Sequence, residues 1–176
     1  MKLRQRSRKA AGFRFGIVVA KFNKPVTSKL LSSCLEGLAE QGVQEADIEV
    51  VRVPGAFEIP LIAQTLGKSG RFDAVICLGA VIRGDTPHFD FISAEASRGI
   101  GQAALDSGVP VIFGVLTTDT ETQAIERADP GTFNRGGEAA KSAIDMATVM
   151  RTIKADKATG SKLTSGNGLA RAKRKR

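Results

Sequence analysis

Histidine occurs once in this chain, at position 88, and only Pro87 separates it from a loop whose residues suit an anion. The loop reads Arg83-Gly84-Asp85-Thr86. Its glycine permits close approach, its threonine offers an amide and a hydroxyl, and a helix is expected just after it. A loop of this kind is a weak signal when taken alone. His88 beside a bound phosphate could move protons near neutral pH, although a helix-terminal histidine with a structural hydrogen bond looks the same in sequence.

Three further residues have side chains that could bind a ligand, and each has a plainer explanation. The ring of Phe22 could stack on a heterocycle, or it could cap the helix that follows. Glu58, after the small residues Gly55 and Ala56, could accept hydrogen bonds from hydroxyl groups, or it could favour the dipole of its own helix. Arg127 could pair with a phosphate, or it could be a helix C-terminal charge. Residue type alone leaves these alternatives open.

The segments around these residues alternate between strand-like and helix-like patterns from Phe15 onward. Short apolar runs predict strands at 15–20, 48–53, 74–78 and 109–116. Apolar residues at three- and four-residue spacing predict helices at 26–38, 57–66, 88–105, 118–128 and 139–150. Gly42 and Gly108 are expected to stop two of these helices, and Thr118-x-x-Glu121 is expected to open the fourth as a capping box.

This alternation predicts an α/β fold. Strands that are wholly apolar belong to a parallel sheet covered on both faces, so we expect a three-layer α/β/α sandwich with a four-stranded parallel sheet. Parallel strands place their carboxyl ends at one edge, and ligands of open α/β sheets bind there. Phe22, Glu58, the 83–88 segment and the exit of the fourth strand should therefore meet at one edge.

The formal net charge of +8 is unevenly distributed along the 176 residues. Residues 1–10 hold five Lys and Arg without an acid, and residues 151–176 hold nine against one Asp, whereas 11–150 holds 12 against 17 Asp and Glu. We therefore expect a flexible basic segment at 1–12, a folded domain at 13–154 and a disordered basic tail at 155–176. Nucleic acid or another polyanion would bind only through the tails, because the acidic body has no nucleic-acid motif.

Cysteine usage and hydropathy exclude several classes of protein. Cys34 and Cys77 lie in apolar stretches and are predicted to be buried free thiols. One histidine and two separated cysteines argue against a dedicated metal site. No apolar run approaches the roughly 20 residues of a membrane span, and no apolar signal core follows the basic start. We therefore expect a cytoplasmic protein that does not associate with membranes.

Six blocks, taken in order, resemble the lumazine synthase family over about residues 13–150. The agreement is specific, because the blocks match in both order and spacing. They are Phe22-Asn23, Val53 to Pro60, Gly79 to Phe91, Pro110 to Thr118, Ile125 to Ala128, and Asn134 to Gly136.

The resemblance implies a flavodoxin-like, oligomer-forming fold and a transferase. The family condenses 5-amino-6-(D-ribitylamino)uracil with 3,4-dihydroxy-2-butanone 4-phosphate, giving 6,7-dimethyl-8-ribityllumazine, phosphate and water. This is the penultimate step of riboflavin biosynthesis, and it needs neither a metal nor an organic cofactor.

The resemblance also implies roles for individual residues. His88 and Arg127 are the implied catalytic residues, and His88 is expected to move protons during imine formation, phosphate elimination and ring closure. The phosphate group is expected at Gly84, Asp85, Thr86 and Arg127. The pyrimidine and its ribityl chain are expected at Phe22, Ala56, Phe57, Glu58, Val81, Ile82, Phe113 and Arg135.

Family members build this site between neighbouring subunits of a pentamer, and some form icosahedral shells of twelve pentamers. Phe113, Arg127 and Arg135 would then come from the neighbour of the subunit that supplies the other residues. The linker Asp129–Phe133 is as short as in shell-forming members, but Asp129-Pro130-Gly131 departs from their usual sequence, so pentamer and shell both stay open. Arg135 replaces a common lysine and presents a planar fork instead of a point charge.

Three alternative functions agree less well with the sequence. A riboflavin synthase of the same fold would have no phosphate substrate, which the 83–86 loop and Arg127 argue against. A catalytically silent lumazine- or flavin-binding shell is supported only by the Arg135 change. Nucleic-acid binding through the tails would be at most a secondary property, because the body carries net negative charge.

Overall fold

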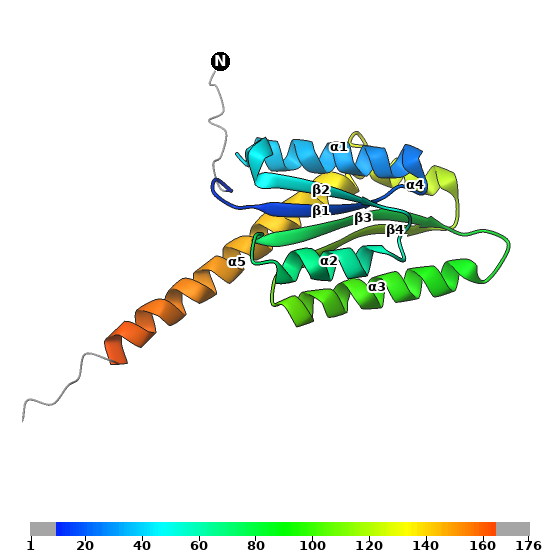
Figure 1. The fold of residues 1–176 in the computed structure, drawn as a ribbon. Helices are drawn as coiled ribbons and strands as arrows, with labels where there is room; N and C mark the ends of the chain where they lie inside the picture. Colours follow the sequence, from blue (N-terminus) through cyan, green and yellow to red (C-terminus); the bar gives the residue numbers. More distant parts are fainter. Residues whose placement is uncertain (1–9, 165–176) are drawn as a thin grey trace, which may run out of the picture.

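A computed structural model describes the backbone of residues 10–164 and the side chains of residues 10–156. Figure 1 shows a central sheet with helices on both faces. The strands are β1 (Phe15–Ala20), β2 (Ile48–Val53), β3 (Ala74–Ile82) and β4 (Val111–Thr118). All paired strands are parallel, in the order β2-β1-β3-β4. The predicted three-layer α/β/α sandwich with a four-stranded parallel sheet is confirmed.

The helices form two layers (Figure 1). On one face lie α1 (Lys24–Glu40), α4 (Glu121–Ala128) and α5 (Arg135–Thr164), and on the other lie α2 (Ile59–Lys68) and α3 (His88–Ser107). A short 3-10 helix at Glu45–Asp47 precedes β2. Gly42 and Gly108 both have positive φ at the ends of α1 and α3, as their proposed role as helix stops requires.

The two central strands are buried on both faces, because one helical layer covers each face of the sheet. Every residue of β1 is buried, and so are the first eight residues of β3. Alternate side chains of these strands enter two separate cores. Ile17 and Ile76 pack under α1 and α5, whereas Val18 and Val75 pack under α2 and α3. This double burial fixes the register that brings the strand exits together.

The start of α4 corrects the predicted capping box. The N-cap is Thr120, whose side chain accepts a hydrogen bond from the Gln123 amide at 3.2 Å, while the Gln123 side chain accepts one from the Asp119 amide at 3.0 Å. Thr118 is instead the last residue of β4, and its hydroxyl donates to the Thr120 carbonyl at 2.9 Å. The predicted box was two residues early because β4 continues through Thr118.

Other element bounds differ from the prediction for local reasons. β4 begins at Val111 because Pro110 has no amide hydrogen for the ladder. α2 begins at Ile59, with Pro60 in its first turn, after a turn in which the Ile59 amide donates to the Ala56 carbonyl.

The last helix extends past the position at which the C-terminal tail was expected to begin. α5 continues to Thr164, whereas the folded domain was expected to end at 154. Residues just past 154, such as Ala155 and Lys157, are good helix formers, so the helix continues without needing a core to cover it. Most of the predicted N-terminal segment, 1–12, lies outside the described residues, and so do residues 165–176 of the predicted tail. No helix in the described part of the chain is both long and apolar enough to cross a membrane.

Both cysteines are buried free thiols, as predicted. Burial raises the pKa of the Cys34 thiol to about 12, and it also raises the pKa of Cys77. Because the thiolate is the reactive form, neither side chain is suited to be a nucleophile or a metal ligand.

We expect both thiols to stay unmodified when the native protein is treated with a thiol reagent at pH 8, because neither thiol is ionised or accessible. Both should react once denaturant is added, and absorbance of the released chromophore measures this. Rapid modification of Cys34 in the native protein would contradict its burial in the core.

α1 and α5 pack closely against each other at Gly136. A Cβ atom there would lie 2.2 Å from the backbone carbonyl oxygen of Leu30, so α1 and α5 could not keep their present separation. At Gly101, in α3, a Cβ atom would meet nothing within 4 Å.

We expect Gly136→Ala to lower the free energy of unfolding by about 2–3 kcal/mol, because the backbone carbonyl cannot move aside as a side chain could. Gly101→Ala is the matched control, and it should be neutral or stabilise α3 by about 0.5–1 kcal/mol. Denaturant unfolding followed by circular dichroism, at equal protein concentrations, measures both. Equal stability of the two variants would contradict the described packing of α1 against α5.

Candidate active site

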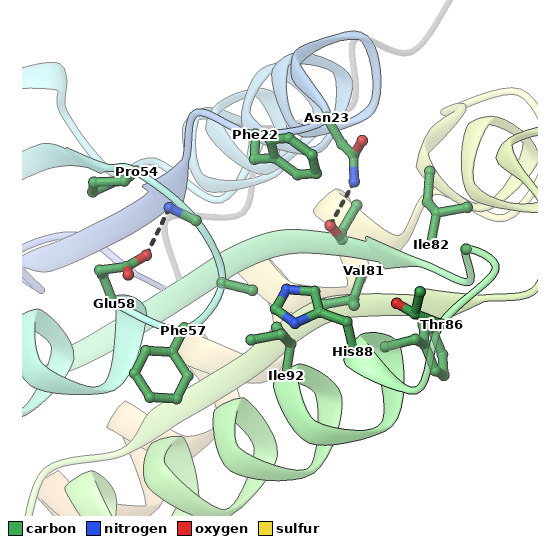
Figure 2. Close-up of a pocket in the computed structure, with 15 residues that line it drawn as sticks. Phe22, Asn23, Pro54, Phe57, Glu58, Val81, Ile82, Thr86, His88 and Ile92 are labelled. Atoms are coloured by element: carbon green, nitrogen blue, oxygen red, sulfur yellow. Dashed lines mark hydrogen bonds between the residues drawn. The ribbon is translucent and has the colours of Figure 1, made fainter.

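A cavity of about 620 Å³ opens at the carboxyl edge of the sheet, where β1, β2 and β3 end. Figure 2 shows His88 pointing from the start of α3 across this cavity, with Phe22 and the loop that carries Phe57 around it. The lining includes nine of the predicted residues: Phe22, Ala56, Phe57, Glu58, Val81, Ile82, Gly84, Thr86 and His88. Residues from three separate strand exits thus share one cavity.

The exit of β1 is tied to both neighbouring strands. The Phe22 amide donates to the Pro54 carbonyl at 3.0 Å, and the Asn23 side-chain amide donates to the Ala80 carbonyl at 2.8 Å (Figure 2). Asn23 has a left-handed conformation, φ 55°, which turns the chain sharply from β1 into α1. This turn leaves the ring of Phe22 70% exposed at the cavity. An exposed aromatic ring held by its backbone can stack on a planar ligand.

The exit of β2 is a compact turn closed by its own acid. A carboxylate oxygen of Glu58 accepts a hydrogen bond from the Gly55 amide at 2.9 Å (Figure 2). The Gly55 amide is therefore occupied by this carboxylate and is not free for a ligand. Phe57 is left 56% exposed at the cavity.

The exit of β3 supplies a loop with free hydrogen-bond donors. No protein acceptor within the described residues takes the backbone N–H groups of Gly84, Asp85 and Thr86. A Cβ atom at Gly84 would meet nothing within 4 Å, so the space beside the loop is open. α3 begins at His88, and only its N-cap, Pro87, separates it from the loop. Free amides ahead of a helix N-terminus suit a phosphate or another anion. Asp85 is exposed and does not line the cavity, unlike the other loop residues predicted to bind.

The three remaining predicted residues lie in a second cavity of about 320 Å³, at the edge strand β4. Phe113, Arg127 and Arg135 line it, and none of its lining residues belongs to the first cavity. The Arg127 guanidinium donates to the Gln123 carbonyl at 3.1 Å. Arg135 pairs with Glu138 at 2.6 Å, so its charge is already partly neutralised. A single chain therefore separates the predicted residues into two groups.

Sequence reasoning missed several lining residues. Phe89 and Ile92 line the first cavity because they follow His88 on the inner face of α3, a face that the helical spacing could have indicated. The role of Asn23 depends on its left-handed conformation, for which the sequence offered little signal. Phe133 was also missed. Its ring centroid lies 5.6 Å from the Arg127 guanidinium carbon and 6.0 Å from that of Arg135.

Charged side chains surround the first cavity. Within the described residues, no group of three His, Cys, Asp or Glu could hold a metal ion. Hydrogen bonds to Asp90 and Asp119 raise the pKa of Arg83 above its ordinary value, so this arginine carries a permanent charge beside the 84–86 loop. The arrangement offers an aromatic ring, free amides, a carboxylate and one imidazole. These groups can orient an anionic, hydroxylated planar ligand and move its protons.

Comparison with known proteins agrees with this chemistry. The family model described as 6,7-dimethyl-8-ribityllumazine synthase matches residues 12–151. A protein named 6,7-dimethyl-8-ribityllumazine synthase from Syntrophus aciditrophicus (strain SB) is 56% identical over 144 residues, which cover 82% of this chain and 94% of that protein. The chain therefore belongs to the 6,7-dimethyl-8-ribityllumazine synthase family.

Proposed function

We propose that this protein condenses 5-amino-6-(D-ribitylamino)uracil with 3,4-dihydroxy-2-butanone 4-phosphate. The products are 6,7-dimethyl-8-ribityllumazine, phosphate and water. The observation that carries the proposal is the shared cavity at the sheet edge, in which Phe22, Thr86 and His88 come from different elements and face the same space. Family membership supports the same reaction.

The proposed roles follow from the chemistry of the residues that line the first cavity. The pyrimidine ring stacks on the exposed ring of Phe22, and the ring edges meet the backbone near Val81 and Ile82. The ribityl chain lies along Ala56 and Phe57, with the free oxygen of the Glu58 carboxylate accepting from its hydroxyls.

The phosphate binds the free amides of the Gly84–Thr86 loop, where negative charge is favoured by the N-terminus of α3. His88 follows this loop and moves protons as the imine forms, phosphate leaves and the ring closes. The amine is already nucleophilic and phosphate is already a leaving group, so holding both substrates together does most of the catalysis. We propose no cofactor for this reaction.

We further propose that the working site forms between two copies of this chain. Arg127, Phe113 and Arg135 carry chemistry that the first cavity lacks, yet they line a separate cavity on the same chain. A head-to-tail contact would place the second cavity of one copy over the first cavity of the next, and repeated contacts of this kind close into a ring. In the single chain, Phe57 is 56% exposed and Phe113 is 45% exposed. Such a contact between copies would cover both of these apolar side chains.

The family pentamer is the ring we propose, with a shell of twelve pentamers as the larger form. The linker between α4 and α5 is tied to α1, because Asp129 pairs with Lys29 at 3.3 Å. Within the linker, Asp129 also accepts a hydrogen bond from the Gly131 amide at 2.9 Å. Analytical ultracentrifugation separates a pentamer from a shell.

A cytoplasmic location, and polyanion binding by the basic tails, stay predictions from sequence. Deleting residues 165–176 should weaken salt-dependent retention on immobilised nucleic acid, and unchanged retention would contradict polyanion binding by that tail.

We expect purified protein mixed with the two substrates to form the lumazine, detected by its absorbance and fluorescence. His88→Ala should lower kcat by about 10- to 100-fold without abolishing turnover, because proximity contributes more than proton transfer. Complete loss of activity in His88→Ala with intact substrate binding would contradict the larger contribution of proximity to the rate. No product from correctly assembled wild-type protein would contradict the proposed reaction itself.

A second experiment tests the shared site by mixing two inactive variants. Gly84→Asp places a carboxylate in the open space at the proposed phosphate loop, and Arg127→Ala removes the cation of the second cavity. Each variant alone should be nearly inactive. Co-assembled hybrids should recover up to about a quarter of the wild-type sites, because one interface in four then has both intact halves.

The matched control pairs two variants of the same cavity, Gly84→Asp with Phe22→Ala. Their hybrids should stay inactive, since every first cavity is damaged. Activity that does not recover in the Gly84→Asp and Arg127→Ala hybrid, although mass spectrometry shows mixed oligomers, would rule out a site shared between copies.

A further inference from the structure

Arg83 lies beside the proposed phosphate loop, but its guanidinium is directed at two carboxylates. The Arg83 Nε atom donates to an Asp119 carboxylate oxygen at 3.0 Å, and a terminal nitrogen lies 3.2 Å from an Asp90 carboxylate oxygen. Asp119 directly follows β4, and Asp90 is in the first turn of α3. The side chain thus connects the segments on either side of the loop.

Two further contacts fix the same residue. The Arg83 guanidinium carbon lies 4.1 Å from the ring centroid of Phe89, which lines the first cavity. The Arg83 backbone amide donates to the Thr118 carbonyl at 2.9 Å, one residue beyond the last β3–β4 ladder pair. Backbone and side chain together hold Arg83 against β4 and α3, and the free amides of Gly84, Asp85 and Thr86 start from this anchored residue.

The local charge balance distinguishes Arg83 from a ligand-binding arginine. An arginine that binds phosphate needs a pair of N–H groups free to make a forked contact. Here two carboxylates share one guanidinium, and a third acid, Asp85, lies in the loop itself. Any anion that approached this guanidinium would meet these negative charges.

We propose that Arg83 is a positioning residue that holds the Gly84–Thr86 loop in its phosphate-binding conformation and does not itself bind the phosphate. The inference rests on the proposed function, because it assigns Arg83 a role in that reaction. The side chains of Arg83, Asp90 and Asp119 are 44%, 59% and 70% exposed, and exposed ion pairs add little to global stability. The effect of losing them should therefore be local to the loop and the start of α3.

Four variants test this role: Arg83→Ala, Asp119→Asn, the double variant of these two, and Arg98→Ala. Arg98 is the matched control, because it is an exposed arginine of α3 that pairs with Glu95 away from the cavity. A positioning role predicts that Arg83→Ala and Asp119→Asn both raise KM for the butanone phosphate, by about tenfold for Arg83→Ala. KM for the pyrimidine should change by less than about twofold, because the ring binds elsewhere. The control should match wild type in both constants.

The double variant separates positioning from direct binding. If Arg83 acts through Asp119, the double variant should be no worse than Arg83→Ala alone. If Arg83 binds the phosphate, Asp119→Asn would free the guanidinium and lower KM for the butanone phosphate, which would overturn the proposal. Additive losses in the double variant, or no effect of Arg83→Ala, would overturn it as well.

Hydrogen exchange gives a readout that does not depend on the reaction. The hydrogen-bonded amides of Arg83, Asp90 and Phe91 should exchange faster in Arg83→Ala and Asp119→Asn than in wild type or Arg98→Ala. If wild-type protein forms no lumazine, the proposed function fails while faster exchange still supports the anchoring of the loop. Unchanged exchange in both variants would overturn the anchoring role, whatever the activity.

Discussion

The pairing of β1 with β3 at the centre of the sheet is the constraint on which the rest of this structure depends. Both strands are covered by helices on both faces, so their apolar side chains fix the register in two cores at once. That register sets where Phe22 and the 83–88 segment leave the sheet. The bond from the Asn23 side chain to the Ala80 carbonyl then locks the two exits together. A ligand cavity follows at this edge because the exits carry small, polar and aromatic residues in place of the β-branched ones of the strands.

The same topology explains why one chain holds only part of the chemistry. β4 is an edge strand, so the groups near Phe113 and Arg127 face outward and away from the first cavity. The single chain thus holds Phe22 and the free amides of the Gly84–Thr86 loop at one cavity, and Arg127 and Arg135 at another. A contact between copies would reunite them, and it would also cover aromatic side chains that the single chain leaves in solvent. Catalysis and assembly are therefore coupled in the proposed mechanism.

The arginines near the two cavities are of two kinds. Arg83 is held by Asp90 and Asp119 within its own chain, whereas Arg127 donates to a backbone carbonyl and has no carboxylate partner among the described residues. An arginine without a carboxylate keeps its charge available for an incoming anion, and one between two carboxylates fixes the backbone near it. Arg135 pairs with Glu138, so it resembles Arg83 more closely than Arg127 in this respect.

The sequence by itself determined the sheet, its helical layers and the residues at the strand exits. It could do so because buried strands, amphipathic helices and turn glycines each leave a local pattern that depends on few neighbours. Patterns at element ends were less certain: the cap of α4 is Thr120 and not Thr118, because pairing with β3 extends β4 past the point where its apolar run ends. The length of α5 was likewise decided by helix propensity beyond the core. Only the tertiary structure separated the predicted site residues into two cavities and directed Arg83 at Asp90 and Asp119. Those contacts join residues up to 36 positions apart, and their partners are set by packing that no local pattern records.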